Sequence, residues 1–143
     1  MMLWAHNGHV AAAAPLSAPD HMPMGGHLRE FFGDKLVSVG FLFQQGSFRA
    51  MDMTRNHISD FTVGPSPRGT LDATFAGLGA PLFAVDLRRL PEGKVADWFA
   101  QPHVSRQIGG GYSEATPGVW MHRILAARDF DLLFFIDKTT PSR

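Results

Sequence analysis

The chain has 143 residues, of which 45% are hydrophobic and 18% charged, the composition of a folded protein rather than a disordered one. Its 13 basic and 13 acidic residues balance, which gives no electrostatic footprint for nucleic acid or for an anionic membrane. The absence of cysteine excludes disulfides, thiolate metal sites and a cysteine nucleophile, and no apolar run approaches the length of a membrane span. We therefore expect a cytoplasmic protein in which residues 1–143 form a single domain.

The first part of the chain predicts a strand, a helix and a second strand. The apolar segment at 2–5 is typical of a short buried strand that ends at His6. Because such a strand needs neighbours on both sides, its position at the start predicts an incomplete domain. After a loop rich in alanine and proline, apolar residues at 24, 28, 31 and 32 share one helical face and predict a helix over 24–32, with Gly33 at its end. The apolar run at 35–43 predicts a strand covered on both faces.

The remaining chain alternates between the same two kinds of element. Residues 47–53 predict another strand, and residues 56–69 are rich in turn-forming glycine and proline. A helix over 70–78 precedes a strand at 81–87, and a short helix is expected at 94–100. The glycine-rich stretch at 109–118 predicts a loop, and 131–136 a last apolar strand. This alternation favours an α/β fold with a largely parallel sheet flanked by helices.

Polar side chains follow several of the predicted strands. Ligands of parallel α/β sheets bind beyond the carboxyl ends of the strands. The residues expected there are His6, Asn7, His9, Gln44, Gln45, Asp86, Arg88 and Asp137. We expect His6, His9 and Asp137 to lie near one another at that edge.

Two imidazoles three residues apart are the most informative feature of the sequence. Histidine acts as an acid, a base or a metal ligand near neutral pH, so His6 and His9 are candidates for chemistry. Their spacing alone is equally compatible with two loop histidines bonded to the backbone.

The segment around these histidines resembles a known family signature. Trp4-Ala5-His6-Asn7-Gly8-His9 resembles the W-x-H-N-x-H signature of the erythromycin esterase family. Further segments resemble that family in the same order along the chain, at 24–30, 33–34, 39–43, 46–50, 70–71, 86–88, 130–133, 136–137 and 139–141. The order of these segments is more specific than any one of them. The chain thus resembles the carboxyl-terminal part of the family domain.

The resemblance implies an activity and roles for individual residues. The implied reaction is hydrolysis of the lactone ester of macrolide antibiotics by an activated water, with no cofactor and with metal dependence left open. His6 would position or polarise the water or the ester carbonyl, and His9 would support it. Asn7, Arg49, Asp86 and Asp137 are the candidates for substrate binding or support. The family's general-base histidine and its supporting glutamates lie in an amino-terminal half, so we expect this chain alone to be inactive.

Three of these candidates also have simpler explanations. Arg49 is compatible with an exposed arginine at a strand end. Asp86 and Asp137 follow strands, where an aspartate often caps a neighbouring helix. Asp137 is alternatively a partner that orients an imidazole.

Two other functions stay open at this point. The chain is compatible with a non-catalytic remnant, or with a subunit that pairs with a separate amino-terminal half. It is also compatible with a small heme- or metal-binding α/β protein that uses His6 and His9, although two imidazoles without thiols disfavour a closed zinc site.

Overall fold

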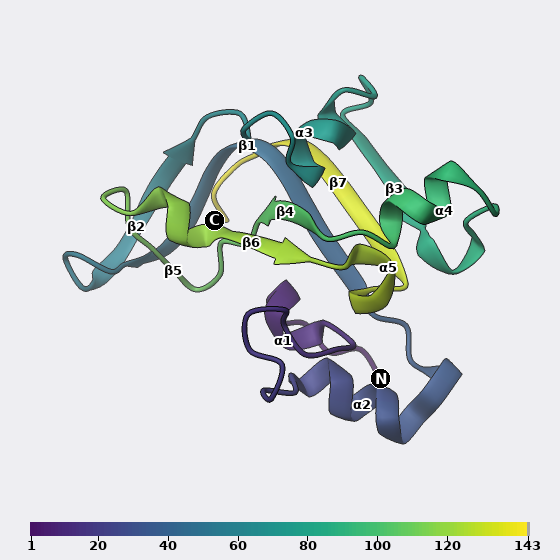
Figure 1. Cartoon of the computed structure of the whole chain (residues 1–143). Helices are drawn as coiled ribbons and strands as arrows, with labels where there is room; N and C mark the ends of the chain where they lie inside the picture. The colour runs from purple at the N-terminus through teal and green to yellow at the C-terminus, as the bar shows by residue number, and fades with distance from the viewer. Residues whose placement is uncertain (143) are drawn as a thin grey trace. The chain divides into compact units, whose positions relative to one another are not determined.

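The structure, a computed structural model, describes residues 1–142, which fall into two compact units. The first unit comprises residues 1–41, 84–103 and 123–134, and the second comprises residues 42–83, 104–122 and those from 135 onward. Strands β1 (Val39–Asp52) and β7 (Leu132–Thr139), both labelled in Figure 1, each contain residues of both units.

The predicted helices are confirmed, two of them in shorter form. The α-helices are α1 (Asn7–Val10), α2 (Met24–Phe32), α3 (Leu71–Ala76), α4 (Lys94–Phe99) and α5 (Ala126–Asp129), and the 3₁₀ turns are η1 (Gly33–Lys35), η2 (Leu87–Arg89) and η3 (Pro117–Trp120). The hydroxyl of Thr70 accepts a hydrogen bond of 3.1 Å from the backbone N–H of Ala73 and so caps α3. No helix within residues 1–142 combines the length and the apolar character needed to cross a membrane.

The strands form a main sheet and a separate pair. Besides β1 and β7 they are β2 (His57–Val63), β3 (Leu82–Asp86), β4 (His103–Arg106), β5 (Gly111–Tyr112) and β6 (Met121–Ile124). The main sheet has the order β2-β1-β7-β3, with β5 paired to β1, while β4 and β6 pair with each other. The expected α/β class with helices beside a main sheet is confirmed.

The directions of the strands make this sheet mixed. Leu132 bonds to Ser38 and Thr139 to Gln45, so β1 and β7 advance together and are parallel. β5 is also parallel to β1, whereas β2 is antiparallel to it. β3 is antiparallel to β7, since Leu87 N–H bonds to Asp131 O and Asp137 N–H bonds to Pro81 O. The expectation of a largely parallel sheet therefore holds for the β1, β7 and β5 strands and not for the outer two.

A long hairpin replaces what the sequence divided into two strands and a turn region. Residues 39–52 form one strand of 14 residues, and 57–63, expected to be turns, form its partner β2. Gly46 permits the continuity, because its φ is 120° and a Cβ there would lie 2.4 Å from the backbone oxygen of Thr139. Asn56, with φ of 54°, lies in the connecting turn.

The predicted strand at 2–5 is absent, and this prediction was wrong for the described chain. Residues 1–6 have no regular secondary structure, and Met2 and Trp4 are 83% and 80% exposed. Residues 2–5 also make no backbone hydrogen bond to another described residue. An apolar segment without a neighbouring strand has nothing to pair with, so its strand propensity is not realised.

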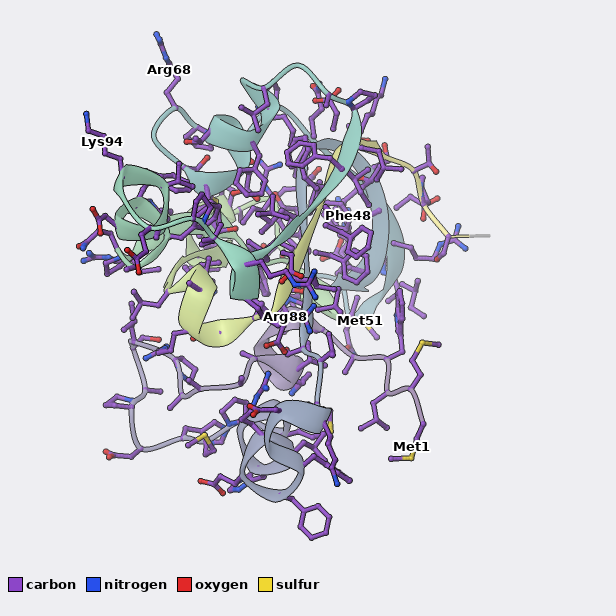
Figure 2. All side chains as sticks on the ribbon, turned by 90° about the vertical axis from the view of Figure 1, so that its right-hand side faces the viewer. Met1, Phe48, Met51, Arg68, Arg88 and Lys94 are labelled. Atoms are coloured by element: carbon purple, nitrogen blue, oxygen red, sulfur yellow. The ribbon has the colours of Figure 1, made fainter. Side chains whose placement is uncertain are left out.

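Each unit has its own packed interior. In the second unit Ala50, Phe61 and Tyr112 are buried together, and Phe48, which is labelled in Figure 2, packs against them. Phe75, Phe83 and Phe135 form another aromatic group of that unit. In the first unit a Cβ at Gly40 would lie 2.8 Å from Leu133, so β1 approaches β7 closely there.

Candidate active site

The two predicted catalytic histidines lie together on the short helix α1. His6 is its N-cap, and the ring Nδ1 accepts a hydrogen bond of 3.1 Å from the backbone N–H of Gly8. The rings of His6 and His9 lie edge to face, with centroids 6.4 Å apart. Because Nδ1 acts as an acceptor, the neutral His6 ring carries its proton on Nε2. His6 is therefore a hydrogen-bond donor through Nε2.

Asn7 fixes α1 against the sheet. Its amide Nδ2 donates to the backbone oxygen of Phe41 at 2.7 Å, and its Oδ1 accepts from the Phe41 N–H at 2.9 Å. The amide thus satisfies both backbone groups of one residue of β1, as a neighbouring strand would. Asn7 is buried, and its role in substrate binding or support stays a prediction.

Helix α2 approaches the other end of α1 through a glycine. A Cβ at Gly25 would lie 2.2 Å from the backbone oxygen of Val10, so only glycine permits this approach. The backbone oxygen of Val10 also accepts a hydrogen bond from the Ser38 hydroxyl. Asp131 accepts hydrogen bonds from the side chain of Arg29 on α2 and from the Ser38 N–H. Together these contacts hold α1 and the histidines within the first unit.

Arg49 lies within β1, not at a strand end, and its side chain is engaged on the surface. Its guanidinium donates two hydrogen bonds to Asp60 of β2, at 2.7 and 3.1 Å, and both side chains are nearly half exposed. The two residues are directly opposite in the antiparallel register. This geometry is that of a cross-strand ion pair, and a role of Arg49 in substrate binding or support stays a prediction.

Asp86 is a helix cap that is also paired with arginine. Its carboxylate accepts from the Arg88 N–H at 3.1 Å and from the Arg88 guanidinium at 3.0 and 2.9 Å. Arg88 is labelled in Figure 2. These hydrogen bonds lower the pKa of Asp86, so the carboxylate stays ionised. The capping role that the sequence left open for Asp86 is the one observed.

Asp137 lies in β7, beside Pro81 of the second unit, whereas Asp86 lies beside the start of β7 in the first unit. Because β3 runs antiparallel to β7, the two strands that carry these aspartates run in opposite directions. One shared carboxyl edge for Asp86 and Asp137 is therefore ruled out. Asp137 belongs to a different unit from His6 and His9, so their expected proximity stays a prediction.

A buried polar network in the second unit was not singled out from the sequence. The carboxylate of Asp72 accepts hydrogen bonds from the Ser105 hydroxyl at 3.3 Å and from the Arg106 N–H at 3.0 Å. Gln107 donates to the same hydroxyl at 3.1 Å. Burial raises the pKa of Asp72 to about 6. An aspartate two residues after a helix start usually indicates solvent-exposed capping, so the sequence carried no signal of this burial.

The described part of the chain offers no preformed metal centre. Within residues 1–142 no group of three or more histidine, cysteine, aspartate or glutamate side chains is placed to hold a metal ion.

Comparison with known proteins places this arrangement in a family. The chain is similar to a protein from Bacillus cereus of known crystal structure, with 25% identity and a TM-score of 0.83 over 97% of this chain and 33% of that protein. It is similar in fold to a solved succinoglycan biosynthesis protein, with 24% identity and a TM-score of 0.83 over 99% of this chain and 34% of that protein. The chain thus spans about a third of the length of the structures it matches. Residues 1–139 match the profile of the erythromycin esterase family, and the chain belongs to that family.

Proposed function

We propose that this chain contributes the His6–His9 part of the active site of a hydrolase that cleaves the lactone ester of macrolide antibiotics such as erythromycin. Family membership supports a hydrolase, and the fixed ring of His6 is the observation that carries the role of this residue. Cleavage of the lactone would inactivate the antibiotic and give resistance.

The chemistry of ester hydrolysis assigns His6 a specific part. A water oxygen attacks the ester carbonyl carbon, the carbonyl oxygen becomes an oxyanion, and the bond to the alkoxide then breaks. The step needs a base that takes a proton from the water and a donor that stabilises the oxyanion. With Nδ1 occupied by the Gly8 N–H, His6 offers the Nε2 proton. His6 therefore serves as the donor to the carbonyl oxygen or to the water, and His9 supports its ring.

The general base then comes from another residue, which the family resemblance assigns to polypeptide outside this chain. The matched structures are about three times as long as this chain, which leaves ample sequence for it. The chain is accordingly the carboxyl-terminal part of the catalytic domain, joined either covalently or as a subunit to the remaining part.

An apolar groove in the first unit supports this second half of the proposal. The groove has a volume of about 570 Å³ and is lined by residues 1–5, by α2 and by residues 35–41. Trp4 contacts Phe41 with tilted rings whose centroids are 5.5 Å apart, and it is still 80% exposed. The apolar face of α2, whose residue spacing predicted this helix, is also partly exposed, since Met24 and Phe32 are 39% and 40% exposed. Apolar surface of this kind favours association, and we assign it to the polypeptide that forms the remaining two thirds of the longer relatives.

The test begins with the DNA upstream of the Met1 codon, which should encode the missing histidine and glutamates in frame or in an adjacent gene. The complete protein is then assayed on erythromycin in ¹⁸O-labelled water by mass spectrometry. We expect one labelled oxygen in the new carboxylate, loss of turnover in His6→Ala, and partial retention in His6→Gln, whose amide restores a donor near Nε2. His27→Ala is the matched control, because His27 is an exposed histidine of the same unit that pairs with Glu30. Turnover unaffected by His6→Ala would reject the assigned role.

The alternative is a non-catalytic subunit that pairs with a separate amino-terminal chain, and the exposed groove favours it equally. The labelled-water assay separates the two, because a non-catalytic subunit would leave the turnover of its partner unchanged in His6→Ala.

A further inference from the structure

A second hollow, in the second unit, has chemistry of its own. Its volume is about 480 Å³, and none of its lining residues takes part in the ester hydrolysis proposed above. One part of its wall is apolar and aromatic, with Val63, Ile108 and Trp120. The other part carries Arg106, Tyr112 and Glu114. A pocket with an apolar wall and a few convergent polar groups is the usual form of a small-molecule site.

Arg106 is a buried cation that no carboxylate pairs. The residue is 9% exposed, and its guanidinium donates to two backbone oxygens, those of Gln44 at 2.9 Å and Gly64 at 3.1 Å. Its Cζ lies 5.4 Å from the centre of the Phe43 ring. Within residues 1–142 it makes no salt bridge with an acidic side chain, and burial lowers its pKa although the nearby charge of Asp72 acts to raise it. A guanidinium has five N–H donors, so Arg106 retains donors beyond the two that these carbonyls use.

Tyr112 brings a second donor to the same place. The residue is 4% exposed, and its hydroxyl makes no hydrogen bond to another described residue. Burial raises its pKa, so the hydroxyl keeps its proton at neutral pH and can donate. Arg106, Tyr112 and Glu114 all line this hollow, and the charges of Arg106 and Glu114 also act on the pKa of Tyr112.

We propose that this pocket binds a small organic acid, with its carboxylate on Arg106 and the Tyr112 hydroxyl and its apolar body against Trp120, Val63 and Ile108. A planar carboxylate accepts from the fork of a guanidinium, and the buried Arg106 guanidinium gains a direct charged partner in addition to the nearby Asp72 charge. Glu114 at the wall disfavours a doubly charged ligand such as a phosphate monoester, because like charges repel. This binding activity goes beyond the proposed hydrolysis and does not depend on it.

The test uses the 143-residue chain and matched pairs of acids and neutral amides. Benzoate, 2-naphthoate and octanoate, and the corresponding amides, are titrated at pH 7 by calorimetry and by tryptophan fluorescence in the Trp4→Phe and Trp98→Phe double variant, which leaves Trp120 of the pocket as the only tryptophan. We expect at least one acid to bind and its amide to bind at least about tenfold more weakly, since a hydrogen bond to a charged group contributes roughly 1.5–3 kcal/mol.

Variants then locate the site. Tyr112→Phe removes only the hydroxyl and should weaken acid binding roughly tenfold, while Glu114→Gln should tighten it by removing a like charge. Arg106→Gln should abolish binding. Because Arg106 also bonds two backbone oxygens, the fold of the Arg106→Gln variant is checked by circular dichroism. If that variant is unfolded, Tyr112→Phe alone decides the test. Arg49→Gln is the control, because that arginine lies in the same unit but pairs with Asp60 outside the pocket. The proposal is overturned if no acid binds, if acid and amide bind equally, or if Tyr112→Phe and Glu114→Gln leave the affinity unchanged.

Discussion

Asp72 provides the sharpest test of the interior of the second unit. Its side chain is fully buried, and burial raises its pKa from 3.8 to about 6 in spite of hydrogen bonds from Ser105 and Arg106. Because the folded state holds this proton more tightly than the unfolded state, Asp72 contributes stability below about pH 4 that is lost as the pH rises through about 6. The difference between the two pKa values corresponds to roughly 3 kcal/mol, at about 1.4 kcal/mol per pKa unit.

The perturbation is Asp72→Asn, which removes the titration and keeps the size of the side chain. The free energy of unfolding is measured by urea denaturation between pH 4 and 7.5 for the native chain and the variant. The native chain should lose up to about 3 kcal/mol relative to Asp72→Asn across this range. The comparison between the two proteins cancels the contribution of carboxylates whose pKa shifts in the opposite direction, because both proteins contain them. Asp60, whose pKa is lowered by Arg49, is one of these. Parallel pH profiles for the two proteins would refute a buried Asp72 with a raised pKa.

Two further substitutions test how α1 is held in the first unit, both by urea denaturation. Asn7→Ala removes both side-chain hydrogen bonds to Phe41 and should destabilise the fold by roughly 1–3 kcal/mol; an unchanged midpoint would show that water replaces the amide at no cost. Gly25→Ala places a Cβ 2.2 Å from the Val10 oxygen and should cost about 1–3 kcal/mol, although alanine favours helices. Gly110→Ala, where a Cβ meets nothing within 4 Å, should leave the stability nearly unchanged. Equal losses of stability in Gly25→Ala and Gly110→Ala would contradict the packing described for α2.

The helices could be predicted from local signals because their determinants are local. The apolar spacing at 24–32 and the glycine after it defined α2 to the residue. The start of α3 was also predicted, with Thr70 as its N-cap, whereas the helix ends at Ala76 with Gly77 as its C-cap rather than at the predicted residue 78. Strand 132–139 was found because its apolar run is buried in the sheet.

The predictions for residues 2–5 and 57–63 were wrong for opposite reasons, and both reasons concern the neighbouring strands. Residues 2–5 have the composition of a buried strand but no strand beside them in the described chain. They are therefore exposed and form no strand in spite of their apolar pattern. Residues 57–63 alternate polar and apolar side chains and lack a buried run, yet pairing with β1 over seven positions makes them a strand. Strand pairing is non-local, and a single sequence does not show it.

The candidate site was predictable as a segment and not as a geometry. The spacing of His6 and His9 identified two imidazoles that do lie together on α1. Asn7, a candidate for substrate binding or support, bonds to Phe41, a residue 34 positions away, which the sequence did not indicate. Arg106 gave no sequence signal, because its environment is assembled from Phe43, Gly64 and other distant residues of the second unit.

Hydrolysis of erythromycin in ¹⁸O-labelled water tests the central claim most directly. The complete protein, with the polypeptide outside these 143 residues restored, should yield a ring-opened acid with one labelled oxygen, and the 143-residue chain alone should yield none. Turnover of the complete protein should disappear in His6→Ala and persist in His27→Ala. Full turnover in His6→Ala, or a product without label, would contradict the assignment of His6 to a hydrolase that uses activated water.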